Sequence, residues 1–231
     1  MRLHRFFVEQ EIGDKKTLEI KEERILYQWR NVLRFSPLDK VILFDGKGSD
    51  FLCEINILTK NEAKLSVLEK MKGIISERKI TLFVSLIKRE NFELVLEKAT
   101  ELGVSHIVPV VAERSEKKSF NYERSAKIIV EASEQSGRAD IPVLSEEVKP
   151  EEAVNKYKKE LNLFAFDPTG SDLYKTIVKN DNLGLFIGPE GGFTLKELDF
   201  FKENEIPVVK LCEQILRAET ASIVAISLIT F

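Results

Sequence analysis

The chain has 231 residues, of which 43% are hydrophobic and 32% are charged. This length and composition predict a protein that can build a core and keep a solvated surface, either as one large domain or as two smaller ones. The formal net charge is -3 at pH 7. The charge excludes a chain that is basic as a whole, so any binding of nucleic acid must come from local patches.

Cysteine and histidine are too sparse for most metal or redox chemistry. Cys53 and Cys212 lie far apart, which argues against a disulfide framework and indicates small buried residues in a reducing compartment. His4 and His106 are the only histidines and lie in different segments. We therefore expect no metal and no histidine-based catalytic triad.

The chain ends carry no membrane signal. The N-terminus, MRLHRFFVEQE, lacks the apolar stretch of a signal peptide. The most apolar segment, residues 221–231, is too short to cross a bilayer. We expect a soluble protein of the cytoplasm.

The first seventy residues have the pattern of a small β domain. Apolar runs at residues 41–44 and 51–58 flank Asp45-Gly46-Lys47-Gly48, which predicts a hairpin. Residues 63–68 alternate between apolar and polar side chains. Residues 26–35 could form a short helix or an irregular segment. We place a first domain at residues 1–70 and a linker at Met71-Lys72-Gly73.

After the linker, short apolar runs alternate with segments of helical spacing. The predicted strands are residues 80–87, 106–111, 161–166, 183–187 and 208–211. The predicted helices are residues 91–103, 122–136, 151–160, 172–179, 194–204 and 218–231. Such alternation indicates an α/β domain, at residues 74–231, whose parallel sheet is covered on both faces.

Three unusual loops follow strands of this sheet. They are residues 167–170, residues 188–192 and residues 212–216, the last running into Arg217-Ala218-Glu219-Thr220. Ligands of open parallel sheets lie outside the carboxyl ends of the strands. If the three strands are neighbours, the three loops could surround one pocket.

The second loop, Gly188-Pro189-Glu190-Gly191-Gly192, is poorly suited to phosphate. It is followed by Phe193-Thr194, whereas a Walker A loop continues with Lys and then Ser or Thr. The carboxylate of Glu190 would also repel a phosphate. Bare backbone beside an acid suits a ligand with hydroxyls or positive charge, such as a nucleoside that carries a sulfonium. The alternative is a tight turn whose acid caps or solvates the next helix.

The third loop also has two interpretations. Ile215 and Leu216 are apolar where a loop is usually polar, so they could flank a flat ring or simply fill the core. Arg217 opens a helix, where its charge opposes the helix dipole. That placement favours a functional role for Arg217, although a structural ion pair with Glu213 or Glu219 would also account for it.

Six segments then occur in an order that identifies a family. They are HRFFV (4–8), NVLRFSPLDKVILFDGKG (31–48), KATELGVSHIVPVVAERS (98–115), EASEQSGRADIP (131–142), FIGPEGGFTLKEL (186–198) and LCEQILRAETA (211–221). They resemble the ribosomal RNA small-subunit methyltransferase E family, which are 16S ribosomal RNA uridine-N3 methyltransferases of the SPOUT, or α/β-knot, class. The resemblance spans nearly the whole chain. Its most specific part is GPEGG paired with ILRAETA at this spacing.

The resemblance implies a fold, an assembly and a cofactor. The first domain would be a PUA-like β-barrel that helps to hold RNA, and the second a methyltransferase domain with a deep trefoil knot, a rare exception among protein folds. The protein would be a homodimer that acts on 16S rRNA of the small ribosomal subunit. The cofactor would be S-adenosyl-L-methionine, held by the three loops.

The resemblance also implies roles for individual residues. The cofactor would be bound by Phe166, Ile187, Gly188, Pro189, Glu190, Gly191, Gly192, Leu211, Ile215, Leu216 and Ala218. Arg217 would be catalytic, stabilising negative charge on a uracil carbonyl oxygen. RNA contacts are predicted for Arg5, Arg34, Lys88, Arg114 and Arg138, for each of which an ordinary surface role is the alternative.

Two positions depart from the family pattern. Cys212 stands where the family often has glycine, and Tyr27-Gln28-Trp29 stands where it often has a histidine before the VLR stretch. Two other functions remain open on the sequence: a non-catalytic RNA-binding assembly factor, and a methyltransferase of this class that acts on another RNA nucleotide. A nucleotide-binding oxidoreductase is disfavoured. Its glycine-rich fingerprint would lie at the end of the first predicted strand of the second domain, where residues 87–91, Ile-Lys-Arg-Glu-Asn, contain no glycine.

Overall fold

The computed structural model describes residues 3–76, 78–116, 120–172 and 182–230. Contacts divide the chain into two units. The N-terminal unit is Met1–Ile75 together with Ser133–Ile141, and the C-terminal unit is Ser76–Ala132 together with Pro142–Phe231. The sequence did not predict that a segment far along the chain, Ser133–Ile141, belongs with the first seventy-five residues.

The N-terminal unit is built on a five-stranded curled sheet of order β1-β3-β4-β5-β2. The strands are β1 Arg5–Phe7, β2 Thr17–Ile20, β3 Lys40–Phe44, β4 Ser49–Leu58 and β5 Ala63–Lys72. β1 pairs with β3 in parallel, and the remaining pairs are antiparallel. The predicted hairpin between β3 and β4 and the predicted strand at β5 are confirmed. β1 and β2 were not predicted.

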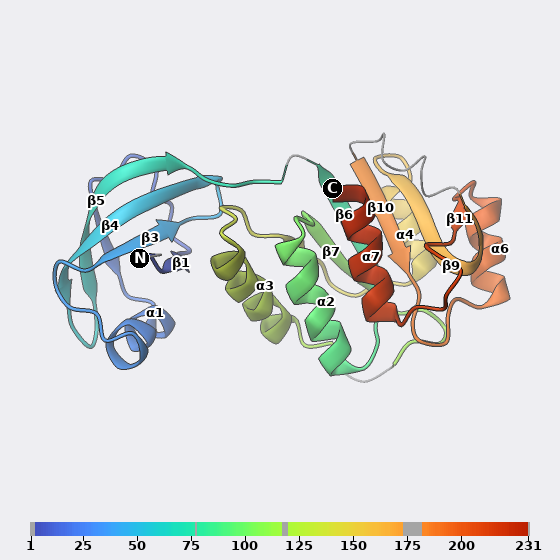
Figure 1. The fold of residues 1–231 in the computed structure, drawn as a ribbon, viewed down its shortest axis with the longest axis horizontal. Coiled ribbons are helices and arrows are strands. Elements are labelled where there is room, and N and C mark those ends of the chain that lie inside the picture. The colour runs from blue at the N-terminus through green and yellow to red at the C-terminus, as the bar shows by residue number, and fades with distance from the viewer. Residues whose placement is uncertain (1–2, 77, 117–119, 173–181, 231) are drawn as a thin grey trace. The chain divides into compact units, whose positions relative to one another are not determined.

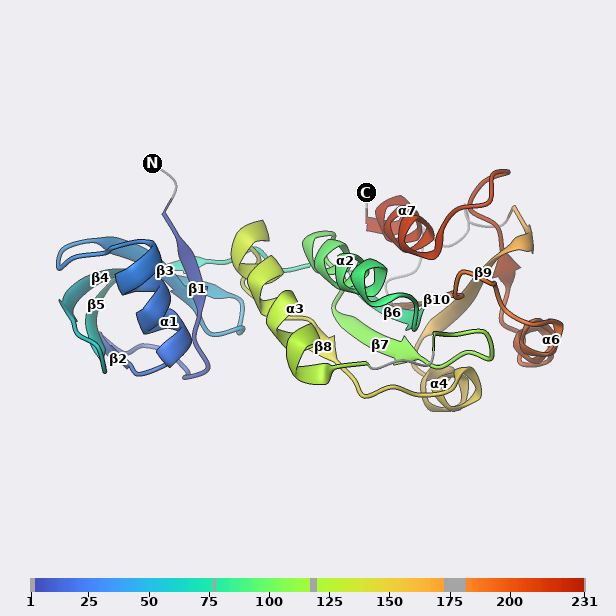
Figure 2. The same ribbon diagram turned by 90° about the horizontal axis from the view of Figure 1, so that it is seen from below.

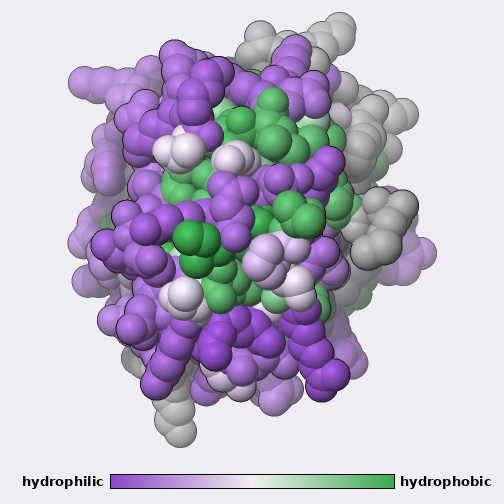
Figure 3. Space-filling view, turned by 90° about the vertical axis from the view of Figure 1, so that its left-hand side faces the viewer, coloured by the Kyte–Doolittle hydropathy of each residue, from purple (hydrophilic) through white to green (hydrophobic). Residues whose placement is uncertain are grey.

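Alternation of side chains gives this sheet one buried face. Phe51, Cys53 and Ile55 of β4 are buried in the core of the unit, as expected for a strand with period two. The ambiguous segment before β3 is α1, Glu23–Tyr27, followed directly by a π-helical turn, Gln28–Val32. This turn places Trp29 fully inside the core. Figure 3, which faces this unit, shows hydrophobic patches interrupted by hydrophilic side chains.

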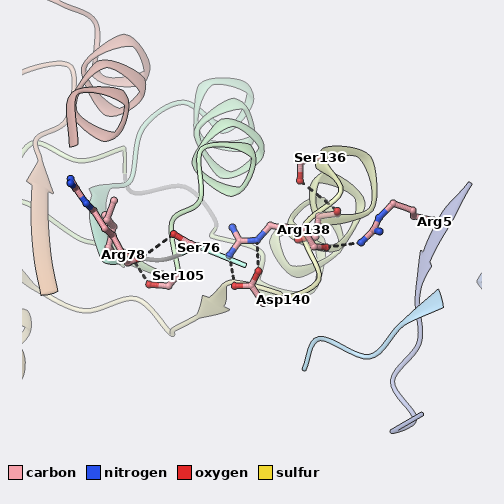
Figure 4. Close-up of polar contacts among 9 residues, drawn as sticks. Arg5, Ser76, Arg78, Ser105, Ser136, Arg138 and Asp140 are labelled. Carbon is pink, nitrogen blue, oxygen red and sulfur yellow. Dashed lines mark hydrogen bonds and ion pairs between the residues drawn. The ribbon is translucent and has the colours of Figure 1, made fainter. Parts of the chain in front are cut away.

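The segment Ser133–Ile141 joins the N-terminal unit through backbone and charged contacts. Gly48 donates to the Ala139 carbonyl at 3.0 Å, and Ala139 donates to the Ile74 carbonyl at 2.7 Å. The Arg5 guanidinium pairs with Asp50. It also donates to the Arg138 carbonyl at 3.1 Å, as Figure 4 shows. These bonds attach the segment to the N-terminal unit, because they satisfy the N–H and C=O groups of Ala139 and the C=O group of Arg138.

The C-terminal unit contains a six-stranded, all-parallel sheet of order β11-β9-β10-β6-β7-β8. The strands are β6 Lys79–Ser85, β7 His106–Val110, β8 Val143–Leu144, β9 Asn162–Ser171, β10 Asn182–Ile187 and β11 Val208–Val209. The prediction of an α/β domain with a parallel sheet is confirmed. β8 was not predicted, and β9 extends to Ser171, beyond the predicted end at Phe166.

Helices cover both faces of this sheet. They are α2 Arg89–Glu101, α3 Tyr122–Ser136, α4 Pro150–Tyr157, α6 Leu195–Glu203 and α7 Ala218–Thr230. In Figure 2, α2 and α7 lie on one side of the sheet and α4 and α6 on the other. The predicted helix at residues 172–179 lies almost wholly outside the described residues. None of the helices within the described ranges is long and apolar enough to span a membrane.

Local signals explain the helix starts near the site. Thr194 caps α6: its side chain accepts from Glu197 N–H, and the Glu197 side chain accepts from Thr194 N–H at 2.8 Å. This reciprocal capping box satisfies two backbone donors at once. Phe201 of α6 packs against Phe186 of β10, which stacks on Phe83 of β6 at 4.3 Å between ring centroids. These ring contacts pack α6 against β10, so the core fixes the two elements that flank the glycine-rich loop.

Candidate functional site

A cavity of about 430 Å³ lies in the C-terminal unit, at the carboxyl ends of neighbouring strands. The segments that line it come from β9, from the loop between β10 and α6, and from the loop between β11 and α7. β9 and β10 are adjacent in the sheet, and β11 is adjacent to β9. The three loops singled out in the sequence therefore meet, as the strand-neighbour hypothesis required.

All the residues predicted to hold the cofactor line this cavity. They are Phe166, Ile187, Gly188, Pro189, Glu190, Gly191, Gly192, Leu211, Ile215, Leu216 and Ala218. Asp167 and Thr169, which belong to the first of the three predicted loops but were given no individual role, also line the cavity, as does Leu195, which was not predicted. Leu195 is 78% exposed and was missed because the first residue of a helix carries no periodic signal by itself.

The glycine-rich loop is a tight turn with a fixed shape. Gly192 N–H donates to the Pro189 carbonyl at 2.8 Å. Gly192 has a φ of 66°, a left-handed conformation that side chains other than glycine rarely adopt. The tight-turn interpretation and the ligand interpretation thus describe the same loop, since the turn is what presents its backbone to the cavity.

Neighbouring segments brace this loop. The Arg114 guanidinium donates to the Gly191 carbonyl at 2.7 Å. Glu113 N–H donates to the Glu197 carboxylate at 2.9 Å, which ties the segment after β7 to the first turn of α6. Arg114 lines the cavity. Its bond to Gly191 holds the glycine-rich loop, which is a second role in addition to the RNA contact predicted for it.

Acidic groups contribute to the cavity wall. Glu190 is exposed and its Oε1 accepts from the backbone N–H of Lys88 at 3.3 Å. Asp167 is 8% exposed and its Oδ1 accepts from Thr169 N–H at 2.9 Å and from the Thr169 hydroxyl at 2.6 Å. Two carboxylates at one cavity disfavour a phosphate ligand and favour a cation or a group of hydroxyls.

The wall from β9 depends on a break in strand pairing. Val208 pairs with Ala165, but the next residue, Val209, pairs with Ser171. The intervening residues of β9, which include Phe166, Asp167 and Thr169, line the cavity. A Cβ on Gly170 would lie 2.6 Å from the backbone of Val209, so glycine is required for this close approach.

The third loop places apolar side chains at the cavity, and Arg217 lies between two of the residues that line it, Leu216 and Ala218. Ile215 is 85% exposed although it lines the cavity, which fits the ring-flanking interpretation better than the core interpretation. Arg217 is exposed and directly precedes α7. Cys212 is half-buried and also lines the cavity, with its Sγ 3.3 Å from the Gln214 carbonyl.

The residues predicted to contact RNA fall into two groups. Arg34, Lys88 and Arg114 are exposed. The side chains of Arg5 and Arg138 are only 9% and 6% exposed and form ion pairs with Asp50 and Asp140 respectively. Arg5 and Arg138 are thus held by internal partners, and their contact with RNA stays a prediction.

Potential metal ligands do not cluster in the described ranges. No group of three or more histidine, cysteine or acidic side chains gathers there in a way that could hold a metal ion.

Comparison with known proteins identifies the class. Residues 75–230 match the family described as the RNA methyltransferase domain, and residues 30–68 match the RNA methyltransferase PUA domain. The fold and the loop-lined cavity are thus those of an RNA methyltransferase with an appended PUA domain.

Individual relatives are more specific. The chain is 29% identical to ribosomal RNA small subunit methyltransferase E of Rickettsia conorii, over 98% of this chain and 95% of that protein. It is 30% identical to the Helicobacter pylori protein of the same name, over 96% and 98%. The Neisseria gonorrhoeae structure of that name, bound to S-adenosyl methionine, superposes with a TM-score of 0.91 at 29% identity, covering 98% and 96% of the two chains. This chain belongs to the ribosomal RNA small subunit methyltransferase E family.

Proposed function

We propose that the chain methylates N3 of a uridine in 16S ribosomal RNA with S-adenosylmethionine as the methyl donor. The observation that carries the proposal is the meeting of the three loops around one cavity whose wall combines bare glycine backbone, apolar side chains and carboxylates. Relatives that share nearly the whole chain bear the name of a small-subunit rRNA methyltransferase.

The residues present fit this donor. Gly188, Gly191 and Gly192 leave the backbone of this loop uncovered, so that an adenosine can lie close to it. Ile215 and Leu216 line the cavity and would flank a flat ring, and Asp167, Thr169 and Glu190 would offer oxygens to hydroxyls or to a positive centre. When bound, S-adenosylmethionine supplies a methyl group on a positively charged sulfur.

Arg217 is the proposed catalytic residue. Uracil N3 carries a proton that must leave before the nitrogen can attack, and negative charge then spreads to the carbonyl oxygens. The exposed guanidinium of Arg217 can stabilise that charge. The new N3–CH₃ bond forms as the sulfur–CH₃ bond breaks, and the proton passes to water. N3 lies on the pairing edge of the base, so the target uridine must be unpaired or flipped out of its helix.

The assembly and the setting are also proposed. Family resemblance supports a homodimer, a trefoil-knotted chain path and action on rRNA in the cytoplasm. Light scattering coupled to size-exclusion chromatography tests the first of these, since a mass near 26.4 kDa would indicate a monomer and contradict the dimer.

The test combines a methylation map with cofactor binding. In cells that lack the gene we expect 16S rRNA without one N3-methyluridine, detected by mass spectrometry. The wild-type gene and a Lys202→Ala control should restore it, because Lys202 is an exposed residue of α6. Arg217→Ala should slow methylation by about 100- to 1,000-fold while the Kd for S-adenosylmethionine stays unchanged.

Two results would contradict the proposal. An unchanged methylation map in the deletion strain would exclude the activity. Failure of the wild-type protein to bind S-adenosylmethionine in calorimetry would favour the alternative of a non-catalytic assembly factor.

A further inference from the structure

Aromatic and arginine side chains gather beside α2 and the start of α3. We name the aromatic–arginine surface by its members: Arg89, Glu93, Phe120, Tyr122 and Arg124. The Phe120 ring contacts Phe92 at 6.1 Å and Tyr122 at 6.2 Å between centroids, both edge to face. A small cavity of about 30 Å³ is lined by Arg89, Glu93, Phe120 and Arg124 among others.

Glu93 holds the two arginines in place. Arg124 pairs with it through two bonds, Nε to Oε1 at 2.5 Å and Nη2 to Oε2 at 2.8 Å, and Arg89 Nε donates to Oε1 at 2.8 Å. The hydrogen bond from Arg124, helped by Arg89, lowers the pKa of Glu93 to about 2. The carboxylate therefore stays ionised near neutral pH and keeps both guanidinium groups oriented.

The surface keeps positive charge and exposed rings. Two guanidinium groups share one carboxylate, and the side chains of Arg89 and Arg124 are 61% and 51% exposed. Tyr122 is 41% exposed, and its hydroxyl donates to the Leu144 carbonyl at 3.2 Å, which restrains the ring. A fixed arginine fork matches a phosphate, and an exposed ring accepts an unstacked base.

One short loop joins this surface to the cavity of the three loops. Lys88, the residue before α2, donates its backbone N–H to Glu190 at the larger cavity. Arg89, the next residue, already lines the smaller cavity. A nucleic-acid strand that places one base beside the cofactor at the mouth of the larger cavity therefore has its neighbouring nucleotides within reach of the aromatic–arginine surface.

We propose that the aromatic–arginine surface binds the single-stranded RNA next to the target nucleotide, with Arg124 and Arg89 on a phosphate and Tyr122 against a base. This rests on the proposed function, because it takes rRNA as the substrate. Glu93 positions the arginines and does not itself contact the RNA. The surface therefore contributes to substrate affinity and not to the methyl transfer.

The test measures RNA affinity directly, apart from methylation. The full-length protein is titrated with a fluorescent single-stranded oligonucleotide from 16S rRNA at several salt concentrations. We expect Arg124→Gln to raise the Kd by about tenfold and to reduce the salt slope by about 0.7 for the lost phosphate contact. Tyr122→Ala should raise the Kd at least about fivefold, as loss of one stacked base does, without changing the salt slope.

Three controls isolate the cause. Arg124→Lys keeps the charge and should retain the salt slope while losing part of the affinity, because lysine lacks the fork. Lys202→Gln removes an exposed charge on another helix and should leave both quantities unchanged. S-adenosylmethionine affinity should match the wild type in all variants.

The outcomes separate this inference from the proposed function. Wild-type RNA affinity and salt slope in both Arg124→Gln and Tyr122→Ala would overturn the inference, even if the wild-type protein methylates rRNA normally. A wild-type protein that binds this RNA through the surface but transfers no methyl group would instead overturn the proposed function and leave the inference standing.

Discussion

Two arginines of the N-terminal unit and three of the C-terminal unit have opposite surroundings. In the N-terminal unit, Arg5 and Arg138 are buried and paired with acids of the same unit. In the C-terminal unit, Arg89, Arg124 and Arg217 are exposed near the carboxyl ends of the strands. A buried guanidinium with a partner stabilises a fold, whereas an exposed one near a cavity remains available for an anion. An arginine within one of the family's sequence segments therefore does not by itself indicate a contact with RNA.

The largest expected effect is the loss of a buried ion pair. Arg5→Ala would leave Asp50, whose side chain is 12% exposed, without its partner. Removing one member of a buried pair costs about 3–5 kcal/mol, so the free energy of unfolding, measured by urea titration, should fall by that amount. The bond from Arg5 to the Arg138 carbonyl is lost as well.

Arg34→Ala is the matched control for this prediction. Arg34 belongs to the same unit but is exposed, and its removal should change stability by less than about 0.5 kcal/mol. If Arg5→Ala were equally mild and instead weakened RNA binding, the contrast between the two units would be wrong and Arg5 would act as the sequence first suggested.

A smaller effect is expected at the glycine-rich loop. A Cβ on Gly191 would lie 3.2 Å from Cδ of Arg114. The Gly191→Val side chain should therefore displace Arg114 and occupy the space in which the cofactor would contact the backbone of the loop. We expect calorimetry to show a Kd for S-adenosylmethionine at least about tenfold higher, or about 1.4 kcal/mol, with a nearly unchanged melting temperature.

Gly170→Ala provides the contrast to this variant. Its Cβ would meet the Val209 backbone at 2.6 Å, so both stability and cofactor affinity should decrease. A Gly191→Val protein that fails to fold, or that binds the cofactor as the wild type does, would contradict the assignment of this loop to the cofactor.

The smallest effect separates the two cysteines. Burial raises the pKa of the Cys53 thiol in the N-terminal unit to about 12, so its reactive thiolate is scarce at pH 8. Cys212 lines the larger cavity of the C-terminal unit. Iodoacetamide should modify Cys212 first in the folded protein, and S-adenosylmethionine should slow that reaction. Mass spectrometry of the digested protein gives both rates, and faster modification of Cys53 would contradict the expected order.

Much of the C-terminal unit could be predicted from the sequence, because its signals are local. The apolar runs of β6 and β10, the helical spacing of α2 and α3, and the glycine-rich loop each lie within about fifteen residues. The short strands β1, β2 and β8 have at most four residues each, so no periodic pattern distinguishes them. They form because a neighbouring strand offers hydrogen bonds, which a single segment cannot reveal.

The sequence alone determined the alternation of the longer strands and helices in the C-terminal unit and the glycine-rich turn, since both depend on residues close together in the chain. It also determined the family, through short segments whose order along the chain is itself part of the sequence. Only the tertiary structure decided which polar side chains have internal partners. Arg5 pairs with Asp50 45 residues away, and Arg124 pairs with Glu93 31 residues away. Both pairs contain an arginine and a carboxylate, but the first is buried and the second is exposed. That difference comes from how the chain packs around each pair, and it separates a structural arginine from one that can bind RNA.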